Sequence, residues 1–350
     1  MLFWISFIIV IFILLCLSTE GPKQYRRLFR LSAIYIIVII SIFRFDVGFD
    51  YRAYYEMLAP TFEPERVGKF ELFDKLIFYV ANDIGFPPSA FIALGLITYI
   101  FVFYALYHYT HSFTLAVLTY LAFFYTTSLG PIRQGAAIAI ILYAYKFLIN
   151  EKLYKYFLCC IIAFLFHRSS IICFFFPIIY KYFNLKILII SSASLFLLFR
   201  GIMYIIDTYL GYGQYLDILN EMEGGSILKY FFLVLNITFL LLTRKQKSIR
   251  EYRLFYLTTF GSLIPFLFGG HLGGRISWYF MCYLCIILPN YIITRSLTIR
   301  RIYAFFLCGF FSLTIWISTK NPVKTPYTPY QTIFSIEDYD RPKFKQEHGL

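Results

Sequence analysis

The chain has 350 residues, of which 60% are apolar and only 15% are charged, and it carries a formal net charge of +13. Soluble domains carry about 25% charged residues, so this composition, with a mean hydropathy of +0.69, excludes an ordinary soluble protein. The basic excess falls in short loops between apolar runs, where it indicates membrane orientation and requires no nucleic-acid partner.

Near-continuous apolar runs follow one another along the chain, and each is typical of a transmembrane helix. They cover residues 2–17, 28–43, 89–107, 113–128, 132–148, 153–166, 169–182, 185–199, 230–242, 254–268, 276–293 and 302–317. The sequence therefore predicts an all-α integral membrane protein, a polytopic bundle of about twelve transmembrane helices. We expect one membrane domain over residues 1–318, with an external loop and short helical segment at 44–88, and a polar external tail at 319–350.

Lysine and arginine in the short loops predict which side of the membrane each loop faces. Residues 23–30, 243–253 and 294–301 are strongly basic. Placing these loops in the cytoplasm lets the remaining loops alternate between the two sides. Both termini are then expected outside.

Two stretches have more than one interpretation. Residues 153–182 form either one long helix or a hairpin of two short helices, and only the hairpin keeps the basic loop 243–253 inside. We expect the hairpin, with His167 and Arg168 at its external turn. Residues 70–86, "FELFDKLIFYVANDIGF", are weakly helical and charged, and two prolines follow them. We expect an interfacial or re-entrant helix on the external side there, because a full crossing breaks the charge pattern.

The chain shows no short motif for a nucleotide or metal: there is no Walker A sequence, GxGxxG, HExxH or GxSxG. The seven cysteines all lie in apolar runs, where a cysteine usually serves as a small hydrophobe. Cys282 and Cys285 form a CxxC, but no second pair or nearby histidine completes a zinc site. We therefore expect neither a metal nor an organic cofactor.

Polar residues at the predicted helix ends fall on one face of the membrane, the external one. They are Asp50, Tyr51, Glu71, Arg133, Gln134, His167 and Arg275. Ionisable groups at the edge of the hydrocarbon are costly, so they are candidates for a functional site. Each also has a plainer interpretation: Arg133 reaches toward headgroups, Asp50 caps the next helix or is solvated, and His167 is an interfacial residue. Their shared face favours a common site.

The order and spacing of these residues resemble the EpsG-type, Wzy-like membrane polysaccharide polymerases. The patterns are Arg44 with Gly48, Asp50 and Tyr51; Glu71 opening a helical segment; Arg133 and Gln134 before two alanines; Phe166, His167 and Ser169; and Arg275 before Tyr279 and Phe280. The chain departs from the family after Glu71, where its Leu-Phe-Asp replaces the Pro-x-Tyr of the family pattern.

The resemblance implies a polymerase of O-antigen, capsule or exopolysaccharide repeat units with a GT-C-like helical fold. Such an enzyme is a metal-independent glycosyltransferase at the external, periplasmic face of the bacterial inner membrane. It transfers the growing chain from undecaprenyl pyrophosphate to the sugar of a second undecaprenyl-pyrophosphate-linked repeat unit. The expected partners are this lipid-linked oligosaccharide and a chain-length regulator in the membrane, with no nucleic acid.

The implied reaction suggests a role for each candidate residue. The leaving pyrophosphate concentrates negative charge, and arginine binds phosphate oxygens bidentately, so we assign Arg133 and Arg275 to it as catalytic groups. The acceptor hydroxyl needs a base, for which Asp50 and His167 are the candidates, with Asp50 preferred. The substrate-binding residues are Glu71, Arg44 as a weaker third phosphate ligand, Gln134 and Ser169 as orienting groups, and Tyr51 and Trp278 as rings that stack on sugars.

A flippase or transporter of lipid-linked sugars is the alternative function. It also needs arginine for pyrophosphate and aromatic rings for sugars, but its translocation path should carry charges near the bilayer midplane. The centres of the predicted helices are nearly free of charge. This favours an enzyme that works at one face of the membrane.

Overall fold

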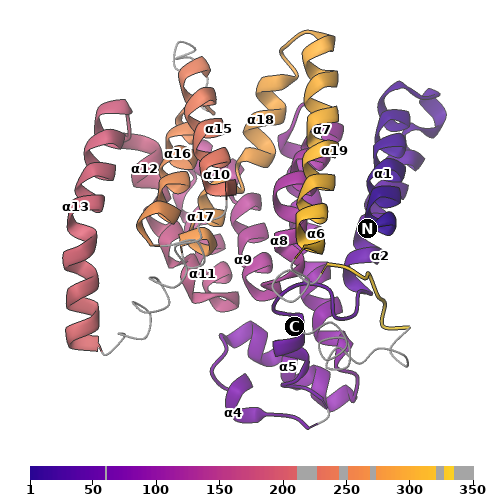
Figure 1. The fold of residues 1–350 in the computed structure, drawn as a ribbon, viewed down its shortest axis with the longest axis horizontal. Helices are drawn as coiled ribbons and strands as arrows, with labels where there is room; N and C mark the ends of the chain where they lie inside the picture. Colours follow the sequence, from indigo (N-terminus) through magenta and orange to yellow (C-terminus); the bar gives the residue numbers. More distant parts are fainter. Residues whose placement is uncertain (60, 211–226, 244–250, 269–272, 321–326, 335–350) are drawn as a thin grey trace. The chain divides into compact units, whose positions relative to one another are not determined.

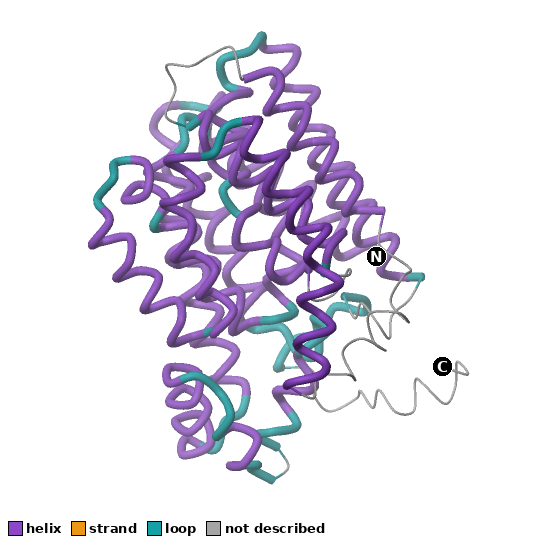
Figure 2. The backbone as a smooth tube through the Cα atoms, turned by 90° about the vertical axis from the view of Figure 1, so that its left-hand side faces the viewer, coloured by secondary structure: helices purple, strands orange, loops and turns teal. Residues whose placement is uncertain are grey.

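The structure is a computed structural model that describes residues 1–59, 61–210, 227–243, 251–268, 273–320 and 327–334. The regular structure of these residues is helical, with no strand among them (Figure 2). Each of the predicted apolar runs corresponds to one helix or to two or three consecutive helical segments, as far as the described residues extend. The expected all-α fold class is therefore confirmed.

Helices long and apolar enough to cross a membrane are present in the described part of the chain. These are α1 (Leu2–Glu20), α6 (Pro88–Tyr109), the pair α9 (Ile132–Tyr143) and α10 (Tyr145–Ile149), and α19 (Leu297–Thr319). Shorter apolar helices lie between them. The chain is thus a multi-pass membrane protein, and the number of about twelve crossings stays a prediction.

The chain divides into two compact units. Unit 1 comprises Met1–Tyr143, Leu165–Arg168 and Leu288–Leu350, and unit 2 comprises Ala144–Phe164 and Ser169–Ile287.

Unit 1 is built from long apolar helices that pack side by side. Helix α1 packs against α2 (Arg26–Ile42), α2 packs against α6, and α6 packs against α9 (Figure 1). Between α6 and α9 the chain forms α7 (Phe113–Tyr120), a π-helical segment (Leu121–Tyr125) and α8 (Thr126–Leu129). Trp4, Phe7, Tyr125 and Phe311 join α1, the π-helical segment and α19 in one aromatic core.

The helices of unit 1 separate a basic end from a polar end. Helix α2 runs from Arg26 to Ile42, so residues 23–30 and 43–50 lie at its opposite ends. Arg30 stacks over Tyr107 near the end of α6, and Asn290 donates a hydrogen bond to the carbonyl of Tyr109 at 3.1 Å. These contacts gather residues 21–30, 107–113 and 290–301 at the basic end. Its cationic side chains are Lys23, Arg26, Arg27, Arg30, Arg295, Arg300 and Arg301.

The polar end of unit 1 carries the short helices α3 (Tyr51–Tyr55), α4 (Pro64–Val67) and α5 (Leu72–Ile84). Helices α4 and α5 lie beyond the ends of the long helices (Figure 1). Helix α5 corresponds to the short helix expected at 70–86 and ends at Gly85, whose φ of 69° is the left-handed conformation common at helix ends. Asp74 and Phe78 face inward, whereas Leu72, Leu76, Val80 and Ile84 form an exposed apolar stripe typical of an interfacial helix.

The segment after α19 also reaches the polar end of unit 1. Residues 327–334 lie beside the chain that follows α2: the amide of Phe45 donates to the carbonyl of Gln331, and that of Ile333 donates to the carbonyl of Phe43, both at 2.9 Å. The hydroxyl of Tyr330 donates to the carbonyl of Ile40 at 2.8 Å. The described part of the expected external tail is therefore attached to the polar end, while residues 321–326 and 335–350 lie outside the described residues.

Unit 2 contains the remaining apolar helices. They are α10, most of α11 (Leu153–Phe166), a 3₁₀ segment (Arg168–Phe175), α12 (Phe176–Tyr182), α13 (Leu185–Leu210), α15 (Ile227–Thr243), α16 (Tyr252–Leu267), α17 (Gly274–Met281) and the start of α18 (Leu284–Ile292). The chain folds back between α11 and α12, because the hydroxyl of Tyr156 donates to the carbonyl of Cys173 at 2.9 Å and the rings of Phe157 and Phe174 stack. This agrees with the hairpin expected at 153–182.

Helices α16 and α17 of unit 2 approach each other closely at glycines. A Cβ atom on Gly261 would lie 2.2 Å from the Cβ of Phe280, and one on Gly273 would lie 2.7 Å from the Cα of Pro265. Small residues permit such close helix packing within a membrane. This packing fixes the start of α17, which carries Arg275 and Trp278.

Candidate functional site

A tight turn after α2 begins the polar end of unit 1. Arg44 is only 2% exposed, and its guanidinium donates hydrogen bonds to three backbone carbonyls. Nε donates to Val47 and one Nη to Leu129, both at 3.0 Å, and the other Nη donates to Ser41. Arg44 thus joins the end of α2, the turn and the end of α8. This geometry supports a structural role, and its predicted contact with phosphate stays a prediction.

Gly48 allows this turn to approach the chain just before α9. Its φ is 111°, and a Cβ atom there would lie 2.1 Å from the carbonyl oxygen of Leu129, so only glycine fits. The ring of Phe49 lies against Gly130 in the same contact. Since α9 begins at Ile132, this contact brings Asp50 close to the first turn of α9.

Asp50 and Tyr51 follow the turn but have different surroundings. Asp50 is half-buried at the N-cap position of α3 and makes no capping hydrogen bond with its side chain. Its negative charge acts on Arg133 and on Tyr327. Tyr51 is buried, with its ring stacked on Phe91 at a centroid distance of 4.0 Å. Tyr51 therefore belongs to the core of unit 1, and its stacking on a sugar stays a prediction.

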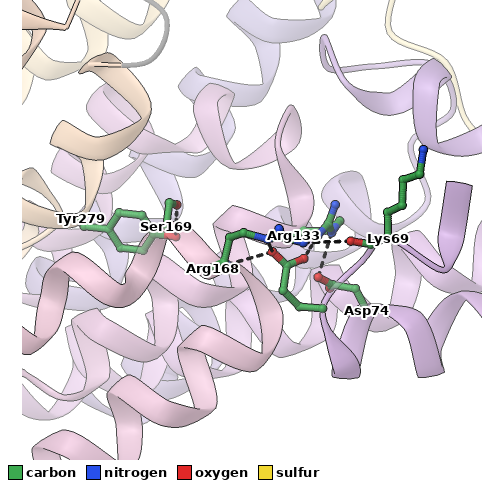
Figure 3. Close-up of polar contacts among 7 residues, drawn as sticks. Lys69, Asp74, Arg133, Arg168, Ser169 and Tyr279 are labelled. Atoms are coloured by element: carbon green, nitrogen blue, oxygen red, sulfur yellow. Dashed lines mark hydrogen bonds and ion pairs between the residues drawn. The ribbon is translucent and has the colours of Figure 1, made fainter. Parts of the chain in front are cut away.

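Arg133 lies at the centre of the polar end, in the first turn of α9. Its Nε donates to Oδ2 of Asp74 at 2.8 Å, and one Nη donates to Oε2 of Glu71 (Figure 3). The ring of Phe70 lies 3.8 Å from its Cζ, a distance at which a cation and an aromatic face attract each other. A buried arginine held on three sides in this way has a fixed orientation.

Asp74 is a site residue that the sequence analysis did not select. Its side chain is fully buried, and Oδ1 has no hydrogen-bond partner among the described residues. Burial raises the pKa of the Asp74 carboxyl, whereas the guanidinium of Arg133 at 2.8 Å favours its charged form. The helical spacing of Glu71 and Asp74, three residues apart, was the signal that these two acids share a face.

His167 and Arg168 lie beside the same cluster, at the turn after α11. The amide and Nε of Arg168 both donate to Oε1 of Glu71, at 2.9 and 3.1 Å. One Nη of Arg168 also donates to the carbonyl of Lys69 at 3.0 Å. The rings of Phe166 and Phe73 lie 5.1 Å apart, so the residues on both sides of His167 contact the start of α5 and its N-terminal flank. His167 itself is half-buried.

The remaining predicted residues are divided between the two units. Gln134 is fully buried in α9 of unit 1, next to Arg133. In unit 2, Arg275 and Trp278 are half-buried in α17, and Oγ of Ser169 donates to the hydroxyl of Tyr279 at 3.2 Å. Unit 1 thus brings together Asp50, Glu71, Arg133, Gln134 and His167, while Arg275, Trp278 and Ser169 belong to unit 2.

The polar end of unit 1 can bind an anion and accept a proton. Arg133 and Arg168 supply fixed guanidinium donors, and the first turn of α9 adds the positive end of a helix dipole. Asp50, Glu71 and His167 supply groups that can accept a proton. Among the described residues no three His, Cys, Asp or Glu side chains are grouped as metal ligands.

Comparisons with known proteins add one finding. The family model described as the EpsG family matches residues 27–332, most of the chain. No curated protein and no solved structure matches it.

Proposed function

The chain belongs to the EpsG family of Wzy-like polysaccharide polymerases, and from this we propose that it joins lipid-linked oligosaccharide repeat units into a polymer. In the proposed reaction the growing chain leaves its undecaprenyl pyrophosphate and is transferred to the terminal sugar of a second undecaprenyl-pyrophosphate-linked repeat unit. The observation that carries this proposal is Arg133, a buried and oriented guanidinium at the start of a helix, with Asp50 and His167 nearby.

We place the polar end of unit 1 at the external face of the bacterial inner membrane. Lysines and arginines favour the cytoplasmic side of a membrane protein. Residues 20–30, 107–113 and 290–301 at the basic end carry seven arginines and lysines and one acidic residue, Glu20. The polar end carries both signs of charge. A basic end in the cytoplasm therefore puts Asp50 and Arg133 on the periplasmic side, where finished repeat units are available.

Arg133 is proposed to stabilise the leaving pyrophosphate. As the anomeric C–O bond breaks, negative charge accumulates on the pyrophosphate, and an oriented guanidinium stabilises that charge more strongly than it stabilises the ground state. Arg275 of unit 2 is proposed as a second phosphate ligand. Because guanidinium groups supply the positive charge, the proposed glycosyltransferase does not need a metal ion.

Asp50 is proposed as the general base. The acceptor hydroxyl must lose its proton as its oxygen attacks the anomeric carbon, and a positioned carboxylate can take that proton. Asp50 is half-buried, and its negative charge acts on Arg133, the proposed ligand of the leaving group. His167 is the alternative base. Trp278, Ser169 and Gln134 are proposed to orient the sugars and the catalytic groups.

The surface polysaccharide of cells that lack the gene tests this proposal. We expect the ladder of polymer bands to collapse to a single repeat unit and to return when the wild-type gene is restored. A single repeat unit on the surface requires that transport across the membrane still works. Loss of every band, including the single unit, would instead support the flippase alternative and contradict the polymerase.

A further inference from the structure

One carboxylate, that of Glu71, accepts hydrogen bonds from three donors at the polar end of unit 1. The amide and Nε of Arg168 donate to Oε1, and one Nη of Arg133 donates to Oε2. We call these three donors the anion seat. Two guanidinium groups and a backbone amide are also the groups that proteins use to bind phosphate oxygens.

The donors of the anion seat are held by contacts that do not involve Glu71. Arg133 is fixed by Asp74, and Arg168 is fixed by the carbonyl of Lys69 (Figure 3). The ring of Phe70 lies against the guanidinium of Arg133. Glu71 lies at the N-cap position of α5, yet its side chain makes no capping hydrogen bond there. The seat therefore keeps its form if the carboxylate leaves, and α5 does not need this carboxylate as a cap.

The charges at the seat favour another anion once Glu71 has left. Arg133 and Arg168 contribute two positive charges, and Glu71 offsets one of them. Asp74 pairs with Arg133, so once Glu71 has left, two guanidinium groups are offset by at most one carboxylate. The Glu71 side chain is 9% exposed, but that of Arg168 is 69% exposed, so the seat is open to solvent on the Arg168 side.

We propose that the anion seat binds the pyrophosphate of the lipid-linked substrate and that Glu71 occupies it only in the unliganded protein. This inference rests on the proposed function and adds Arg168 as a ligand of the substrate. Pyrophosphate and Glu71 compete for the same donors. The measured free energy of binding is therefore that of the contacts with pyrophosphate minus that of the Glu71 contacts that are lost. In the unliganded protein the Glu71 carboxylate occupies the three donors, and the pyrophosphate displaces it when the substrate binds.

Binding of farnesyl pyrophosphate to the purified protein in detergent tests the exchange. Glu71→Gln keeps the size of the side chain but removes the competing charge, so we expect the ligand to bind about tenfold more tightly, the scale of one hydrogen bond to a charged group. Arg168→Ala should weaken binding. Glu63→Gln is the matched control, because Glu63 forms an exposed ion pair with Arg66 in the same loop, and its affinity should equal that of the wild type.

The outcomes separate this inference from the proposed function. If farnesyl pyrophosphate binds to Glu71→Gln no more tightly than to the wild type, while Arg133→Lys loses binding, the exchange is wrong and the proposed phosphate site remains. If Arg133→Lys also binds as the wild type does, the proposed phosphate site itself is wrong. If Glu71→Gln tightens only the binding of phosphatidylglycerol, the seat holds a lipid headgroup and the inference is overturned.

A second variant covers the case in which Glu71→Gln does not fold. Glu71→Asp keeps the charge but draws the carboxylate back by one methylene, so it cannot reach the donors of both arginines. We expect farnesyl pyrophosphate to bind to Glu71→Asp more tightly than to the wild type. An unchanged or weaker affinity would contradict the exchange.

Discussion

Arg133→Lys is expected to lower the rate of polymerisation by about 100- to 1,000-fold, the usual effect of removing one oriented group that stabilises transition-state charge. Lysine keeps the positive charge but lacks the planar fork, so it cannot hold Asp74 and a phosphate at the same time. The polymer ladder of cells that carry this variant should shorten to the single repeat unit.

The matched control for Arg133→Lys is Arg66→Lys. Arg66 lies in α4 at the same end of unit 1, but it is exposed and pairs only with Glu63 among the described residues. This variant should leave the ladder unchanged. The amount of each protein in the membrane must be measured too, because breaking a buried ion pair costs roughly 3–5 kcal/mol. A normal polymer ladder in cells that carry Arg133→Lys at a normal protein level would show that Arg133 is not a catalytic residue.

Asp50→Asn is expected to lower the rate by about 10²- to 10⁴-fold, the usual contribution of a general base. Asparagine has the same shape but cannot accept the proton of the acceptor hydroxyl. Because asparagine keeps the size and shape of the side chain, the fold should be retained. The measurement is the rate of chain extension with purified protein, and binding of farnesyl pyrophosphate should be nearly unchanged.

His167→Gln in the same assay distinguishes between the two candidate bases. If Asp50 is the base, Asp50→Asn is the slower of the two variants. The control is Asp83→Asn, since Asp83 is an exposed acid at the end of α5. An Asp50→Asn protein with the wild-type rate, beside an inactive His167→Gln protein, would transfer the role of base to His167.

Hydropathy predicted the helices of this chain because a helix that crosses a membrane needs a continuous run of apolar residues. The hairpin at 153–182 and the short helix α5 were also predictable, since the charges of the loops restrict the path of the chain. The ends of elements were less predictable. Helix α13 continues to Leu210, well past the apolar run that ends at 199, and the run at 276–293 is divided between α17 and α18.

The candidate site was predictable in its location more than in its contacts. The charge pattern assigned Asp50, Glu71, Arg133 and His167 to one face, and unit 1 places them at one end. Sequence could not show that Arg44 is bonded to backbone carbonyls. Nor could it show the pairs of Arg133 with Asp74 and of Arg168 with Glu71, because these residues are 59 and 97 positions apart in the chain.

The most direct test of the proposed function is a reaction with purified components. The protein is placed in liposomes with one lipid-linked repeat unit as its only substrate, in the presence of a metal chelator and without a nucleotide sugar. We expect chains that are whole-number multiples of the repeat unit, together with released undecaprenyl pyrophosphate. If the repeat unit remains unextended by a protein that restores the polymer ladder in cells, the chain does not itself catalyse the polymerisation, and the proposed mechanism is wrong.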